Sequence, residues 1–555
     1  MTTAKTTDRN PVPWYDRVSD WFNAILIKEA RQSLKSRQFV GSFMLLLAVA
    51  WVVSVFLLLN SGPALEYGDV GRGFFFSFYL VLGFAAIVIV PFSAMRSLIS
   101  ERDLNTFDLL SITSLKPRQI VWGKLLSAGL QLFLFYSAIT PFIAFASLMQ
   151  GFDTAAAAVI LIGTMLVSLL LSMAALMLST FARNRFFQAI ATTGAIAGLI
   201  WAYGWTVGGV FSALQRAWID VGDPFFWWGA AFLALASLTY FVLFQQITVA
   251  QLTFESDNRS TGVRIVCTAQ FWVLWLAVGL FYYVQKDVPD PVVLQILVAF
   301  SAIHLAVAGL IFATEGDFLT RRVRRGVPHN RLLRWLVAPF MPGGARGFWL
   351  ALMHVLALWV IVVAVQGRDG LRPSTLSVES YYRGLTDLQS PTWTQTLRVS
   401  TAVCAYVVIY LGIAAALGRW ASSISSDARP AHVRVLTVLV LTAGVIFPLV
   451  LRATEAVKQP NTVFDVTSPS MTIQYLVRKS PPAQVPFDWS APRESLNELI
   501  RRRGYADVII VLLMMAAGAA VLVNGAALYR GFRDLQPLRR DSAGNDRAGG
   551  GVSAA

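Results

Sequence analysis

Twelve long apolar blocks constrain what this chain can fold into. Only 14% of its 555 residues are charged, whereas soluble domains contain about 25%. A helix needs about 20 apolar residues to cross the hydrocarbon core of a bilayer, and each block is near that length. The blocks cover residues 40–60, 74–95, 125–149, 157–181, 187–211, 226–250, 265–284, 291–313, 347–365, 399–418, 433–451 and 505–529. The sequence therefore predicts an all-α, polytopic integral membrane protein with about 12 transmembrane helices.

The blocks form two groups of six. Each group returns the chain to its starting side of the membrane, an arrangement compatible with parallel repeats. Loops 96–124 and 315–346 occupy the same topological place in the two groups, although no residue-level identity relates them. The predicted domains are a cytoplasmic leader at 1–39, a first six-helix region at 40–250, a second at 251–529 with an outer loop at 452–504, and a disordered polar tail at 530–555.

The distribution of Lys and Arg predicts the orientation. If the N-terminus is cytoplasmic, the segments on that side hold 31 basic and 15 acidic residues, and the opposite segments hold 15 and 16. This excess follows the positive-inside rule, so both termini are predicted to be cytoplasmic. The rule also accounts for the net charge of +15 without a nucleic-acid partner. Three arginines at 501–503 oppose the bias, either because their loop is too long for the rule or because a helix there is miscounted.

The leader contains an amphipathic pattern before the first apolar block. Its apolar residues recur at spacings of three and four, which places them on one helical face. Charged residues occupy the rest of the helix, so we expect it to lie in the inner headgroup layer. A solvated charged leader is the alternative. The apolar face consists of Phe22, Ile25, Leu26, Ala30 and Leu34, and the charged residues include Lys28, Glu29 and Arg31.

The loop at 96–124 is too long for a simple turn and contains two helical patterns. Leu104, Phe107 and Leu110 form an apolar face on the first pattern. A break follows at 114–117, where Pro117 suits the first turn of the next helix. A short helix with one apolar and one charged side is suited to docking in the groove of a partner. The alternative is that the segment lies on lipid without a partner.

These segments resemble the permease subunits of type-2 ABC exporters. The leader is similar to the N-terminal elbow helix of that family, through Lys28, Glu29 and Arg31, and the first six blocks fit its topology. The second six have no counterpart in the basic six-helix permease, so the chain resembles an extended form. The loop at 96–124 is similar to the family's ATPase-coupling loop, through Glu101, Arg102, Leu104, Thr106, Phe107, Leu109, Leu110, Thr113, Pro117, Gly123 and Lys124.

The resemblance implies an exporter permease in the bacterial inner (plasma) membrane, driven by an ABC-type ATPase. The chain contains no Gly-x-x-x-x-Gly-Lys-Ser/Thr loop to hold phosphates, so ATP is expected on a separate subunit. We expect no catalytic residue, cofactor or metal in this chain, and membrane lipid as its other neighbour. Two permease cores must face each other, and the sequence leaves open whether a homodimer or the two halves supply them. The substrate and the role of the outer loop also stay open.

Two other functions compete with this hypothesis. A secondary transporter with 12 helices generally needs acids or bases inside its spans, and only His304 and His354 lie deep in the predicted ones. A membrane scaffold or assembly factor without transport activity is the second alternative, because the outer loop at 452–504 is long enough to bind a partner. An associated ATPase would favour the permease over the scaffold.

The predicted orientation can be tested by labelling cysteines in intact cells. We expect Ser114→Cys to resist a membrane-impermeant thiol reagent, because loop 96–124 faces the cytoplasm. Ser374→Cys, in the predicted outer loop 367–397, should react under the same conditions. The native Cys267 and Cys404 lie within predicted spans and supply the background. Labelling at position 114 in intact cells would contradict the orientation.

Overall fold

The structure is a computed structural model, and it is all-α in the residues that it describes. Twelve of the helices there are long and apolar enough to cross a membrane, so the predicted fold class is confirmed. The chain divides into two compact units, 1–254 and 255–555. The described residues are 27–28, 31–32, 34–62, 70–103, 116–149, 151, 153–181, 185–216, 219–254, 257–285, 290–317, 319–370, 393–424, 430–453, 466–479, 493–533 and 535.

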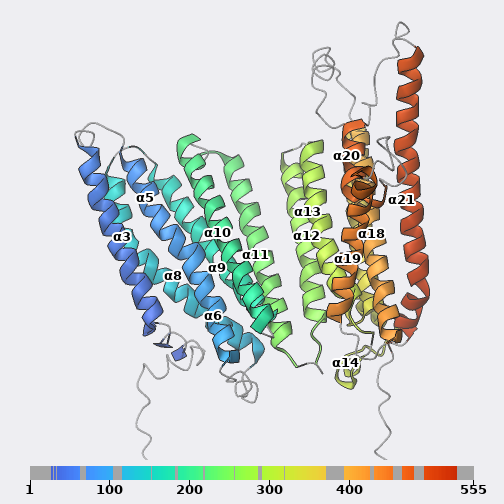
Figure 1. The fold of residues 1–555 in the computed structure, drawn as a ribbon, viewed down its shortest axis with the longest axis horizontal. Helices are drawn as coiled ribbons and strands as arrows, with labels where there is room; N and C mark the ends of the chain where they lie inside the picture. Colours follow the sequence, from blue (N-terminus) through green and yellow to red (C-terminus); the bar gives the residue numbers. More distant parts are fainter. Residues whose placement is uncertain are drawn as a thin grey trace, which may run out of the picture. The chain divides into compact units, whose positions relative to one another are not determined.

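The first unit contains six of the candidate spans, which run up and down beside one another (Figure 1). The second span consists of three consecutive segments, α5, η1 and α6. The elements are α3 (Arg37–Ser61), α5 (Gly71–Phe84), the π-helix η1 (Ala85–Ile89), α6 (Val90–Asp103), α8 (Pro117–Leu148), α9 (Thr154–Phe181), α10 (Arg185–Arg216) and α11 (Pro224–Leu252).

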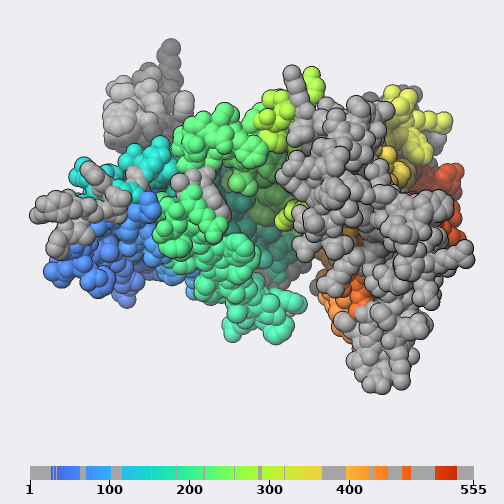
Figure 2. All heavy atoms as spheres, turned by 90° about the horizontal axis from the view of Figure 1, so that it is seen from above, coloured from blue at the N-terminus to red at the C-terminus, as the bar shows by residue number. Residues whose placement is uncertain are grey.

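The second span forms the centre of this unit. In the most apolar 18-residue stretch of this span 56% of the residues are buried, whereas the corresponding fraction is 6% in α11 and 11% in α3 and α10. Its aromatic residues Phe74, Phe75, Phe78 and Tyr79 are fully buried against α8 and α9. At the end where α10 and α11 are joined, their side chains stand at the surface of the unit (Figure 2). Along their length α10 and α11 expose large apolar side chains such as Trp201, Trp205, Leu233 and Leu238, which are suited to contact with lipid.

A π-helical turn interrupts the second span between α5 and α6. Pro91 follows it and has no amide hydrogen to donate to the preceding turn. The carbonyl oxygen of Ala86 instead accepts a hydrogen bond from the Ser168 hydroxyl of α9, at 2.5 Å. Because water is absent from a bilayer core, a side chain must satisfy a carbonyl that leaves the regular ladder. The interruption is therefore fixed by α9.

The second unit holds the other six candidate spans, and α18 is its central helix, with 72% of its most apolar stretch buried. Short helices occupy two of its connections. The elements are α12 (Thr261–Val284), α13 (Pro291–Ala313), α14 (Arg321–Arg325), α15 (Arg331–Val337), the 3-10 turn η2 (Ala338–Phe340), α16 (Gly344–Gly370), α18 (Trp393–Ile424), α19 (Pro430–Ala453), α20 (Pro469–Lys479) and α21 (Arg493–Arg533).

The last helix is longer than the sequence predicts. We expected a span at 505–529 after a loop at 452–504, but α21 begins at Arg493 and α20 also lies in that segment. Pro492 precedes α21, and no proline interrupts its 41 residues. At 1.5 Å per residue it is about 60 Å long, twice the thickness of a bilayer core. The arginines at 501–503 therefore lie in a helix that continues beyond the candidate span Asp507–Arg533.

Helices α13 and α16 approach closely where the chain returns after α15. A Cβ atom at Gly344 would lie 2.7 Å from the carbonyl oxygens of both Ala313 and Glu315. These are backbone atoms, which cannot rotate away as a side chain does. Glycine is therefore required at the start of α16 for this packing.

We expect Gly344→Ala to lower the free energy of unfolding by about 1–3 kcal/mol, the usual cost of overpacking. Gly418→Ala is the matched control, because the nearest atom to its new Cβ would be 3.8 Å away. Thermal or denaturant unfolding of the purified protein in detergent measures both changes. Equal stability of the two variants would show that the close approach is not a constraint.

A candidate functional site at the Glu101 end of the first unit

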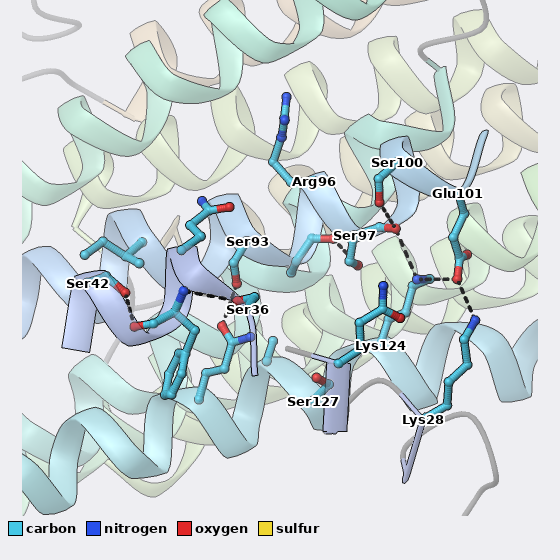
Figure 3. A pocket seen from close by; sticks show the side chains of 17 residues that line it. Lys28, Ser36, Ser42, Ser93, Arg96, Ser97, Ser100, Glu101, Lys124 and Ser127 are labelled. Carbon is cyan, nitrogen blue, oxygen red and sulfur yellow. Dashed lines mark hydrogen bonds and ion pairs between the residues drawn. The ribbon is translucent and has the colours of Figure 1, made fainter. Parts of the chain in front are cut away.

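Helices α3, α6 and α8 surround a polar pocket at the end of the first unit where α6 ends and α8 begins. Its volume is about 420 Å³. Figure 3 shows serine side chains from α3, α6 and α8 around it, with Glu101 between two lysines. Its polar lining includes Gln32, Ser36, Ser93, Arg96, Ser97, Ser127 and Gln131. This concentration of polar groups is unusual for the interior of an apolar helix bundle.

Glu101 is the centre of the charged part of this site. It lies in the last turn of α6 and its side chain is 12% exposed. Its Oε1 atom lies 3.2 Å from Nζ of Lys124 and 3.6 Å from Nζ of Lys28. Lys124 belongs to α8, and Lys28 belongs to the segment before α3. One carboxylate thus joins three parts of the chain that are distant in sequence.

The two lysines differ in environment. The Lys124 side chain is only 1% exposed, and its ammonium group also donates to the carbonyl oxygen of Ser97 at 3.3 Å. A buried ammonium group is stable only when it is paired and hydrogen-bonded. The Lys28 side chain is 56% exposed, so its pairing with Glu101 is weakened by solvent. The Glu101–Lys124 pair therefore stabilises the packing of α6 against α8, whereas Lys28 binds Glu101 at the solvent-exposed edge of the pocket.

Hydrogen bonds order the remainder of the pocket. The Ser93 hydroxyl donates to Oε1 of Gln131 at 2.7 Å, which connects α6 to α8. The Ser36 hydroxyl accepts from the amide of Phe39 and so caps the start of α3. The guanidinium of Arg96 points away from the Glu101 cluster, and its residue is exposed (Figure 3). The pocket therefore has a fixed polar wall, and Arg96 and Lys28 are exposed cations at its edge.

The structure brings together three residues of the predicted coupling loop and elbow, Lys28, Glu101 and Lys124. Pro117 is the first residue of α8, as the sequence predicts for the helix after the break. Gly123 and Lys124 are buried in the second turn of that helix, and Lys124 pairs with Glu101. The sequence indicated each of these residues separately. It gave no sign that Lys28 from the leader reaches the same carboxylate.

Several predicted residues lie outside the part of the chain that the structure describes. The backbone of Arg102 belongs to α6. The predicted docking face and its neighbours are not among the described residues, nor is most of the elbow helix. These residues are Leu104, Thr106, Phe107, Leu109, Leu110 and Thr113 in the loop, and Phe22, Ile25 and Glu29 in the leader. Their roles remain predictions.

The described part of the leader separates the polar pocket from an apolar one. Ile27 and Arg31 border a cavity of about 680 Å³, whose other walls come from α8, α9 and α11. Both residues thus face apolar surface, while Lys28 lines the polar pocket. This two-sided environment is what an amphipathic leader requires. The apolar walls include Trp122, Leu125, Leu126, Met165 and Phe241.

A second acid–base cluster lies in the corresponding place of the second unit. Glu315 follows α13, the second span of that unit, and its Oε2 atom accepts from Nη2 of Arg264 at 2.5 Å. Arg264 is fully buried in the first turn of α12. The Ser260 hydroxyl donates to the same carboxylate at 2.8 Å. The sequence placed Arg264 in a polar link, because apolar patterns do not reveal how far a helix continues beyond its apolar block.

Arg264 also fixes the connection that precedes α16. Its guanidinium donates to the carbonyl oxygens of Pro339, Met341 and Gly343, at 2.9, 2.6 and 3.0 Å. The buried Arg346 donates to the carbonyl oxygen of Gly531 at 2.9 Å, which ties the connection to α21. Each arginine therefore has a defined structural role in loop closure. Among the described residues, no group of three potential ligands is placed to hold a metal ion.

The fold and these sites define a multi-pass membrane protein. Comparison with models of known protein families, with curated proteins and with solved structures gives no match. A more specific function must therefore be argued from the residues and their geometry.

Loss of either lysine tests the assignment of roles around Glu101. We expect Lys124→Met to lower the free energy of unfolding by about 3–5 kcal/mol, because it removes one partner of a buried pair. Lys28→Met is the matched control and should cost less than about 1 kcal/mol, as for exposed pairs. Unfolding of the purified variants in detergent provides the measurement. Adding Glu101→Gln to Lys124→Met should recover part of the loss, and equal costs for the two lysines would contradict the assignment.

Proposed function

We propose that this chain is the transmembrane permease subunit of an ATP-driven exporter, with ATP bound by separate subunits. The observation that carries the proposal is the contact of Glu101 with both Lys28 and Lys124. The resemblance to ABC permeases assigns these three residues to the coupling loop and the elbow helix. Their meeting at one carboxylate provides the physical link that such a machine needs between its loop and its membrane helices.

In this mechanism, ATP binding closes the partner subunits and displaces the loop at 104–117. Glu101 and Lys124 stand at the two ends of that loop, in α6 and α8, so the displacement reaches both helices. Because Lys28 pairs with Glu101, the same displacement also moves the leader. The π-helical turn at Ala85–Ile89 lies between α6 and the outer half of the same span, which allows the two halves to respond differently. The chain's own contribution is mechanical, without bond-making chemistry.

An exporter core needs two permease halves that face each other. Two copies of this chain supply them in a homodimer, or the two six-helix units supply them within one chain. The corresponding positions of Glu101 and Glu315 support a relationship between the units. The apolar spans suit a lipid, glycolipid or other hydrophobic substrate better than a small ion.

Pull-down of the ATPase by permease variants tests the proposed docking loop. We expect Phe107→Ala to weaken association strongly, because anchors of this type often cost about 2 kcal/mol or more on truncation. Glu101→Ala should weaken association less, because charges at the rim of an interface contribute little to binding, and it should uncouple transport, because Glu101 pairs with Lys124 and Lys28. Binding is normalised to the amount of permease in the membrane.

The double variant Phe107→Ala with Leu110→Ala separates the alternatives. Neither residue lies in one of the apolar blocks of the sequence, so the variant should still insert in the membrane. Wild-type ATPase binding by this variant would show that the segment does not couple. If no ATPase copurifies with the wild-type chain either, the scaffold function would be favoured.

A further inference from the structure

The connection between α13 and α16 presents a surface that the exporter proposal does not use. It contains α14 and α15, and no acidic residue occurs between Asp317 and Asp369. Six arginines lie between Thr320 and Trp335, and Arg321, Arg325 and Arg331 among them are exposed. The segment is therefore strongly basic where it meets its surroundings.

The same surface exposes a row of large apolar side chains. In α15, Leu332 is 74% exposed, Leu333 51%, Trp335 60% and Leu336 65%. The helix has only seven residues, so these four leave it almost no polar surface apart from its two arginines. A contiguous group of large apolar side chains is rarely exposed to water and usually marks a contact surface. We call Arg321, Arg325, Arg331 and these four residues the arginine–tryptophan surface.

The arginine–tryptophan surface is held in place by a small core of its own. Val323, Val327 and Met341 pack with Leu535, which follows α21. Trp335 stacks on Phe532 with ring centroids 4.5 Å apart and the rings 17° from parallel. The guanidinium of Arg334 donates inward, to the carbonyl oxygens of Pro328 and His329. The exposed residues are thus displayed by a fixed structure.

The position of the surface places it at the level of a membrane boundary. It is attached to the ends of three helices that are candidate spans, α13 at Ala313, α16 at Gly344 and α21 at Arg533. Figure 1 shows α14 beyond the end of the neighbouring α12 and α13. Trp and Arg are the residues that typically anchor a membrane protein at this depth. The immediate neighbour of such a surface is the headgroup layer.

We propose that the arginine–tryptophan surface binds anionic phospholipids of the adjoining leaflet. Leu332, Leu333 and Leu336 enter the boundary between headgroups and acyl chains, as in interfacial amphipathic helices. The guanidinium groups bind the lipid phosphates, for which their planar donors are well suited. Asp257 pairs with Arg322 at 2.8 Å, and the excess of arginine that remains favours an anionic lipid over a neutral one. The proposal rests on the membrane-spanning fold and is independent of the exporter function.

A soluble protein is the competing occupant. Loop 315–346 has the same topological place as the predicted docking loop 96–124, so the ATPase is the specific rival. Lipid is favoured because the apolar residues adjoin the span ends, where bilayer already surrounds the chain. The surface also carries charge of a single sign, whereas the predicted docking segment 101–110 combines Glu101 and Arg102 with its apolar residues.

Lipid binding by the purified full chain in detergent tests the proposal. The probes are phosphatidylglycerol and phosphatidylcholine, and native mass spectrometry measures the number bound and the apparent Kd. The charge variant carries Arg321→Gln, Arg325→Gln and Arg331→Gln. We expect about fivefold weaker phosphatidylglycerol binding per arginine, and therefore about 100-fold weaker binding for the variant, with phosphatidylcholine binding unchanged.

The matched control removes three exposed cations from the first unit, by Arg37→Gln, Arg118→Gln and Arg185→Gln. It should keep wild-type affinity for phosphatidylglycerol. Equal loss in the control would show that binding follows net charge, which overturns the proposed site. Equal unfolding temperatures of both variants in phosphatidylcholine ensure that lost binding does not reflect lost structure.

A label at Leu332→Cys tests the apolar part directly. An environment-sensitive fluorophore there should be quenched by lipids that carry a quencher near the headgroup, in vesicles that contain phosphatidylglycerol. Absence of quenching would overturn insertion. If the charge variant binds lipid normally but no longer copurifies with the ATPase, the surface is a protein-docking site and the lipid proposal is wrong.

Discussion

The absence of water from a bilayer core is the constraint on which the rest of this structure depends. Every backbone amide and carbonyl within it must find a partner in the protein, and helices provide those partners locally. Where the helical hydrogen bonds are interrupted, at Ala85–Ile89, the Ser168 hydroxyl donates to the Ala86 carbonyl in place of a backbone amide. The two buried cations of the acid–base clusters, Lys124 and Arg264, lie near helix starts, where each is paired with a carboxylate. The architecture and both acid–base clusters follow from this one condition.

The two units meet the constraint in related ways. Glu101 closes the second span of the first unit, and Glu315 follows the second span of the other. Each carboxylate receives a buried cation, Lys124 or Arg264, at the start of another span. The chemistry differs in detail, because arginine also binds three backbone carbonyl groups and lysine binds one. The second connection is thereby bound tightly to its own unit.

The sequence was sufficient for the number and type of the helices, because long apolar blocks have no stable alternative to spanning. It also identified Pro117 as a helix start. It was insufficient for the ends of helices such as α21, since the residues of that helix before Tyr505 are mostly polar and form no continuous apolar block. The meeting of Lys28, Glu101 and Lys124 depends on tertiary packing, which local patterns do not encode. The predicted docking residues between 104 and 113 lie outside the described structure.

The π-helical turn also sets the rotational phase of everything that follows it in the span. In an α-helix each residue advances the chain by about 100° and 1.5 Å. The π-helical turn is wider, because its hydrogen bonds reach five residues ahead rather than four, so the same five residues in regular α-geometry would turn α6 further around the axis relative to α5. Glu101 would then leave the side of the helix that faces Lys124. The register of the ion cluster is thus determined about three turns away, within the interior of the span.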